Sequence, residues 1–151
     1  MTVDFDALAR DAEAEGNPEK HLHALARAIF SLSHWHFIAR GEASRPNPFI
    51  ASHAGTAGGI PMVRAFTDTT RLGRFAEEHG LVEERGIRVM SVPLSEGDVV
   101  AWLEHYIPLG AEGLWFNSDA ESHGFFFPLR ALRGIRDAAH GVVAAEPSEP
   151  A

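Results

Sequence analysis

The stretch from Gly59 to Leu81 limits the fold of this chain more than any other; it reads GIPMVRAFTDTTRLGRFAEEHGL. Its first part, residues 60–66, is mostly apolar and is typical of a buried strand. Apolar side chains then recur at three- and four-residue spacing, which places them on one face of a helix. Thr67 or Asp68 can cap the first turn of that helix, and Gly80 fits the left-handed position after the last turn. The stretch therefore predicts a strand, a capped turn and an amphipathic helix. The core residues expected from it are Phe66, Leu72 and Phe75.

The chain before and after this stretch alternates between helical and extended patterns. Two apolar stripes at helical spacing, in 4–15 and 18–32, are separated by Gly16-Asn17-Pro18 and predict an N-terminal helical hairpin. Strands interspersed with helices predict an α+β fold with a single mixed β-sheet of five to six strands, packed helices and that hairpin. Further strands are expected at 34–40, 49–53, 86–93, 113–117 and 124–127, and further helices after Asp98 and from Pro128.

Length and composition set the domain organisation. The chain has 151 residues, 45% of them hydrophobic, which is enough for one compact domain with its own core. We place this domain at 1–140, with the N-terminal helices at 4–32. From Gly141 onward the sequence turns to Ala, Pro, Ser and Glu, so residues 141–151 are expected to form a disordered tail.

Charge and cysteine content narrow the range of partners. Thirteen Lys and Arg against 21 Asp and Glu give a formal net charge of −8, and no run rich in Lys or Arg is present. Such a chain repels phosphate backbones, so we expect no nucleic-acid partner. Neither a signal peptide nor an apolar run long enough for a membrane span is evident. With no cysteine either, we expect a soluble cytoplasmic protein without membrane contact or disulfides.

Nine histidines are the most unusual feature of the composition. On a strand, His34 and His36 point to the same face about 7 Å apart, a spacing found in zinc and iron sites. A neighbouring strand could bring His53 beside them. Against this, a catalytic zinc takes three protein ligands with supporting hydrogen bonds, and the strand itself offers no carboxylate. We therefore predict no metal ion and no cofactor.

Motifs for nucleophilic or nucleotide chemistry are weak. The hints of a nucleophile and a base are Ser52-His53, Thr67-Asp68, and Ser118-Asp119 together with His123, but no Gly-x-Ser-x-Gly elbow is present. The glycine-rich loop 54–59 lacks the Gly-Lys-Ser/Thr ending of a phosphate loop. We therefore assign no catalytic residue.

Aromatic residues gather in a predicted hairpin. Trp115 and Phe116 are consecutive, and residues 125–127 are all phenylalanine. Alternate residues of a strand face opposite sides, so consecutive aromatics cannot enter one core. Either helices cover both faces of the sheet, or one set of aromatics is exposed and marks a partner surface. The candidate binding residues of such a surface or cleft are Trp115, Asn117 and Phe125.

Two short segments carry a family resemblance. Residues 61–67, PMVRAFT, lead into a helix, and residues 113–117, GLWFN, follow a further strand and helix. This order resembles the SseB-like family (the SseB protein N-terminal domain), named after a bacterial protein linked to enhanced serine sensitivity. In that family a segment like Pro-x-x-x-Phe-Thr precedes a helix, and here it is loosened, with four residues between Pro61 and Phe66. A Gly-x-x-x-Asn segment comes later in the family, often continuing Asn-Pro where this chain has Asn117-Ser118. The resemblance covers about 35–136 and implies an α+β fold in a bacterial cytoplasmic protein, without established catalytic residues.

The leading functional hypothesis is therefore a non-enzymatic SseB-like domain that acts as a protein-interaction or regulatory module. Its partner is an unidentified protein, or a second copy in a homodimer. Two alternatives remain open. One is a small His-based metal-dependent enzyme centred on His34, His36 and His53, and the other is small-molecule binding in a cleft beside Trp115 and Asn117.

Overall fold

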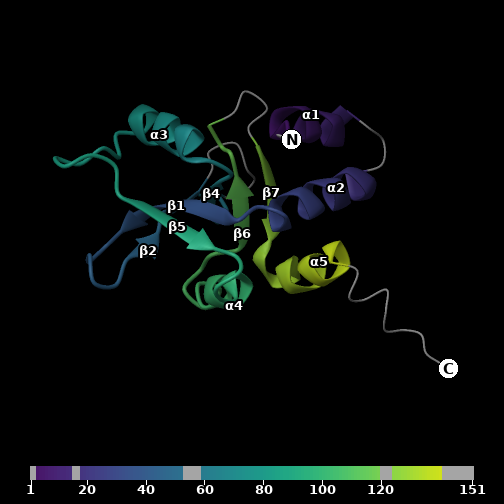
Figure 1. Cartoon of the computed structure of the whole chain (residues 1–151). Helices are drawn as coiled ribbons and strands as arrows, with labels where there is room; N and C mark the ends of the chain where they lie inside the picture. The colour runs from purple at the N-terminus through teal and green to yellow at the C-terminus, as the bar shows by residue number, and fades with distance from the viewer. Residues whose placement is uncertain (1–2, 15–17, 53–58, 120–123, 141–151) are drawn as a thin grey trace.

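A computed structural model of the chain describes residues 3–14, 18–52, 59–119 and 124–140, with the backbone alone for 12–14 and 18–21. In this part of the chain one mixed sheet of seven strands is packed with five α-helices (Figure 1). The helices are α1 (Phe5–Ala14), α2 (Pro18–Phe30), α3 (Thr69–Glu78), α4 (Val99–Glu104) and α5 (Leu132–Ala139), the last preceded by the 3₁₀ turn η1 (Leu129–Ala131). The strands are β1 (His34–Arg40), β2 (Asn47–Pro48), β3 (Ile50–Ser52), β4 (Pro61–Phe66), β5 (Val89–Pro93), β6 (Gly113–Phe116) and β7 (Phe125–Pro128).

The predicted α+β class, the single mixed sheet and the N-terminal helical hairpin are confirmed, since α1 packs against α2. The expected count of five to six strands was too low. The strand predicted at 49–53 is present as β3, and the additional strand is β2 just before it, because the chain pairs first with β1 and then with β4. Phe49 lies at the change of partner: its N–H donates to the Ile38 carbonyl, and its own carbonyl accepts from the Arg64 N–H. The segment from β2 to β3 thus pairs with β1 through its first part and with β4 through its second part.

β4 lies at the centre of the sheet. The main strand order is β2-β1-β4-β6-β7, with β3 also paired to β4 and β5 paired to β1. β4 is antiparallel to β1 and parallel to β6. The hairpin predicted for the aromatic segments is present as β6 and β7, which are antiparallel neighbours.

The strand, capped turn and helix predicted from the opening stretch are confirmed. The Asp68 side chain accepts a hydrogen bond from the Arg71 N–H and caps α3, and Gly80 has the left-handed φ of 68°. Phe66, Leu72 and Phe75 are buried as predicted. Together with Ile38 and Ala76 they form a small core between α3 and the sheet.

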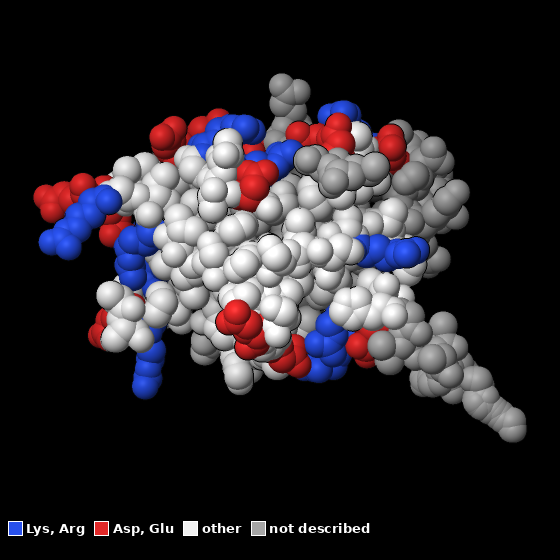
Figure 2. All heavy atoms as spheres, viewed as in Figure 1, with Lys and Arg blue, Asp and Glu red and all other residues white. Residues whose placement is uncertain are grey.

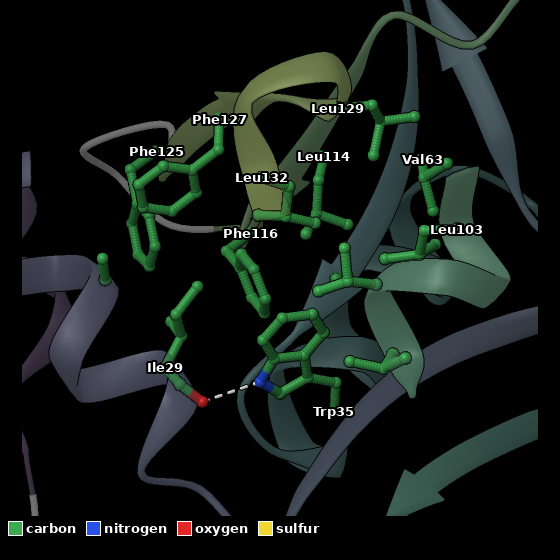
Figure 3. Packing of buried hydrophobic residues seen from close by; sticks show 14 of the residues in the cluster. Ile29, Trp35, Val63, Leu103, Leu114, Phe116, Phe125, Phe127, Leu129 and Leu132 are labelled. Carbon is green, nitrogen blue, oxygen red and sulfur yellow. Dashed lines mark hydrogen bonds between the residues drawn. The ribbon is translucent and has the colours of Figure 1, made fainter. Parts of the chain in front are cut away.

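The main core lies on the other face of the sheet, beneath α2, α4 and α5 (Figures 1 and 3). Val63 and Ala65 of β4 face this core, whereas Phe66 faces α3, as strand alternation requires. Trp35 is fully buried, and its indole Nε1 donates to the Ile29 carbonyl at 2.7 Å, a bond visible in Figure 3. The indole N–H is therefore satisfied by the last turn of α2, and this bond fastens the helical hairpin to the sheet.

Two further predictions concern membrane-spanning helices and the C-terminal tail. None of the described helices is long and apolar enough to cross a membrane. The predicted tail, 141–151, lies outside the described residues, so its disorder stays a prediction.

Candidate functional site

The two segments that carry the family resemblance meet at the carboxyl ends of the parallel strands β4 and β6. Thr67 directly follows β4, and Asn117 directly follows β6. The Thr67 N–H donates to Asn117 Oδ1 at 3.0 Å, and Asn117 Nδ2 donates to Thr67 Oγ1 at 3.1 Å. Both residues are buried. The Asn117 side chain thereby joins the ends of two strands that are far apart in the sequence.

Asn117 also sets the direction in which the chain leaves β6. Its φ of 58° lies in the left-handed region, which asparagine tolerates better than most residues other than glycine. Candidate residue Asn117 therefore has a clear structural task, which uses both its side-chain amide and its backbone conformation. Sequence analysis named this residue but not its contact with Thr67.

Replacing Asn117 by alanine is expected to lower the free energy of unfolding by about 2–3 kcal/mol, because the buried Thr67 N–H loses its acceptor. Asn117→Gly loses the same hydrogen bonds but accepts the left-handed φ without strain, so it should be less damaging by about 1 kcal/mol. Urea denaturation of both variants measures the two contributions. A loss of only a few tenths of a kcal/mol in Asn117→Ala would show that the bond does not hold the strand ends together.

A network of charged side chains lies beside this junction. Arg71 on α3 reaches Asp6 of α1 at 3.1 Å and Asp119, just after β6, at 3.6 Å. Arg74 contacts the same Asp119 oxygen at 2.9 Å. The Asp119 side chain has 0% exposure, and burial raises the pKa of its carboxyl, while Arg71 and Arg74 act in the opposite direction. Asp119 is therefore held in place by two arginines, and the base suggested by Ser118-Asp119 together with His123 stays untested, because His123 lies outside the described residues.

A hollow of about 690 Å³ lies next to the junction. One wall is polar and comes from the start of α3, and the other comes from the start of α1 and the end of α2. Its size suits a small molecule. Trp115 does not line this hollow, and the cleft predicted beside Trp115 and Asn117 stays a prediction. The lining residues are Val3, Asp4, Phe5, Ala28, Ser31, Leu32, Thr67, Asp68 and Arg71.

The histidine pair on β1 has the predicted arrangement. His34 and His36 lie on one face, with stacked rings whose centroids are 6.2 Å apart. His36 Nδ1 is 2.7 Å from Ser91 Oγ, and burial and the neighbouring His34 lower the pKa of His36. Among the described residues no three His, Cys, Asp or Glu side chains converge as a metal site. His53 lies outside that part of the chain, so the three-histidine arrangement stays untested.

Trp115 is buried on the α3 side of the sheet. The guanidinium of Arg64 lies over its ring at 5.1 Å and over the Phe75 ring at 5.8 Å. Arg64 is only 4% exposed, its Nη2 donates to the Ala51 carbonyl at 3.1 Å, and burial lowers its pKa. The described residues place no carboxylate within ion-pair distance of Arg64, so the two aromatic rings are its main electrostatic support.

Phe125 is buried on the opposite side, in the main core. Its ring stacks between Phe5 of α1, at 6.0 Å, and Phe116 of β6, at 5.5 Å. Both faces of the sheet are therefore covered at Trp115 and Phe125, and neither of these candidate binding residues is at the surface. A contact of Trp115, Asn117 or Phe125 with a ligand stays a prediction.

Phe126 is the exposed member of the aromatic hairpin. It is 49% exposed and packs loosely on Trp115, at 6.0 Å between ring centroids. Together with α2 and α5, which lie beside β7 in Figure 1, it borders an apolar hollow of about 230 Å³. We call this hollow the β7 groove. Its lining residues are Leu22, His23, Ala26, Phe126, Phe127, Pro128, Ile135 and Ala138.

The backbone of β7 offers hydrogen-bonding groups to this groove. The Leu129 N–H donates to the Glu112 carbonyl on the β6 side. In an antiparallel pair the backbone groups of successive residues alternate in direction, so those of Phe125 and Phe127 face β6 and those of Phe126 face away. No backbone partner of the Phe126 N–H or carbonyl occurs among the described residues. Within the described part of the chain, β7 is thus an edge strand along an apolar groove.

Comparisons with family models, curated proteins and solved structures found no match to this chain. The resemblance to the SseB-like family therefore stays a prediction.

Proposed function

We propose that this chain is a non-enzymatic, SseB-like interaction module that binds an extended, uncharged segment of another protein along β7. The observation that carries the proposal is the edge at Phe126, which is exposed beside an apolar groove and whose backbone groups have no backbone partner among the described residues. In one common mode of peptide recognition, used by several types of domain, an edge strand of this kind is extended by a strand of the partner.

The groove determines how such a segment would lie. Main-chain hydrogen bonds to Phe126 would hold it as an additional strand, about 4.8 Å from β7. Alternate side chains of the segment would then point toward Leu22 of α2 and Ile135 of α5, which line the groove. Because Pro128 has no N–H, pairing would be confined to a short stretch. Recognition would thus depend on two or three apolar side chains with matching spacing.

The charge distribution limits the chemistry of the partner. No Asp, Glu, Lys or Arg is among the described side chains that line the β7 groove, so a charged side chain entering it would lose hydration without gaining a counter-charge from them. On the face drawn in Figure 2, basic and acidic side chains alternate around the rim, and the middle is uncharged. The described part of that face has no continuous basic patch for a phosphate backbone. Both observations support an uncharged protein segment as the ligand.

The test is a selection of short displayed peptides on the purified protein, followed by titration of the selected peptide against variants. Peptides with apolar residues at alternate positions are expected. Phe126→Asp should weaken their binding by about tenfold or more, as loss of a central aromatic anchor does. Chemical-shift changes at β7 on titration would locate the peptide.

A matched control comes from Val82, which is 48% exposed and lies after α3, outside the groove. Val82→Asp introduces the same charge at an equally exposed apolar site and should leave binding unchanged. Equal binding to wild type and Phe126→Asp, with both proteins folded by circular dichroism, would contradict the proposal.

A further inference from the structure

α1 depends on its packing for stability. The helix has only 10 residues, and isolated helices of this length are marginal in water. Asp4 caps its first turn by accepting from the Ala7 N–H, and Phe5 and Ala9 are its buried residues among the described side chains. Among the described residues α1 packs mainly on α2 and touches other elements at fewer points.

Two of these points connect α1 to the sheet and to α3. The Phe5 ring stacks on Phe125 at 6.0 Å, and the Asp6 carboxylate pairs with Arg71 at 3.1 Å. Arg71 keeps a second acidic neighbour, Asp119, at 3.6 Å. Release of α1 would therefore leave Arg71 with a counter-charge, so that no buried cation is left unpaired.

The surface beneath Phe5 continues the β7 groove. Phe125 and Phe127 face the same side of β7, and their rings are 6.0 Å apart. Phe127 already lines the groove, whereas Phe125 is covered. Removal of Phe5 would expose Phe125 and lengthen the apolar surface along the strand.

We infer that α1 is a detachable cap on the binding surface. When α1 moves away from Phe125, Phe125 becomes part of the β7 groove. The partner segment binds this open form more tightly. The inference rests on the proposed function for the ligand, but the release of α1 does not depend on it. A ligand that prefers the open form shifts the equilibrium only by its difference in affinity for the two forms. Weakening the contacts of α1 should therefore strengthen binding.

Hydrogen exchange on the full chain measures the release. Amides of α1 are expected to exchange much faster than those of β4, through an opening that leaves the sheet intact. Asp6→Asn should speed exchange in α1 by about fivefold, the factor that corresponds to loss of one modest ion pair, and leave β4 and β6 unchanged. Asp11→Asn is the matched control, because Asp11 is exposed on the same helix. Exchange of α1 at the rate of β4, or equal effects of the two variants, would overturn the inference.

A second variant distinguishes the contact of α1 with the sheet from the stability of the helix itself. It is needed because Asp6 also lies in the first turn of α1, where its charge affects the helix. Phe5→Leu removes the ring contact with Phe125 without changing charge, and should speed exchange in α1 in the same way. Peptides selected on the groove should bind both variants severalfold more tightly than wild type. Faster exchange with unchanged binding would show that α1 does not cap the binding surface. The proposed function has a separate test: peptide binding that is unchanged by Phe126→Asp would contradict it.

Discussion

Replacing Phe75 by alanine is expected to lower the free energy of unfolding by about 3–5 kcal/mol, the usual cost of deleting a buried aromatic ring. Phe75 is buried at the centre of the small core between α3 and the sheet. Its ring lies 5.3 Å from that of Phe66 and 4.1 Å from that of His79, and it also lies under the Arg64 guanidinium. The variant would leave a cavity and remove one of the two rings that support a buried cation.

Urea denaturation followed by tryptophan fluorescence measures this loss, with Phe75→Leu as the control that removes less side-chain volume. Phe75→Leu should cost roughly half as much or less, because it keeps most of the apolar contact. A loss below about 1 kcal/mol in Phe75→Ala would mean that the strand–helix unit is not the core it is taken to be.

Gly124→Ala is expected to destabilise the protein by about 3 kcal/mol or more, from backbone strain and a steric clash together. Gly124 has a φ of 70°, a conformation that L side chains rarely adopt. An added Cβ would overlap the Phe116 carbonyl and lie 2.6 Å from the Asn117 carbonyl, and backbone atoms in a strand pair cannot easily move. The hairpin of β6 and β7 would have to open at its end.

Gly134→Ala is the matched control for this effect. Gly134 lies in α5, where an added Cβ meets nothing within 4 Å. This substitution should be neutral or stabilise by up to about 1 kcal/mol, because alanine favours helix. Thermal melts of the two variants should therefore shift in opposite directions or by very different amounts. Similar melting temperatures for both would contradict the steric argument.

Local structure was well predicted from the sequence because it depends on near neighbours. The spacing of Leu72, Phe75 and Ala76 sets the buried face of α3, and the Asp68 cap follows from the preference of helix starts for a short polar side chain. In the same way, strand alternation shows that Trp115 and Phe116 face opposite sides.

Long-range features were not predictable in this way. The approach of Arg71 to both Asp6 and Asp119 depends on three elements that are widely separated in the chain, and no spacing rule connects them. The exposure of Phe126 is a similar case. Alternation places it on the α3 side of the sheet, but only the structure shows that the core beneath α3 contains no residue of β7. The β7 groove therefore depends on where the helices pack against the sheet, which local sequence patterns do not predict.

The position of β4 has a consequence for how the chain acquires its structure. β4 is paired with β6, and α3, β5 and α4 all lie between the two strands in the sequence. Parallel pairing across such a long connection forms slowly, because a large loop must close before any contact is gained. During synthesis from the N-terminus, β1 and β4 can pair while one side of β4 still waits for β6 to leave the ribosome. Until then this central strand, which is buried along nearly its whole length in the final fold, has an open edge, and aggregation of nascent chains should begin there.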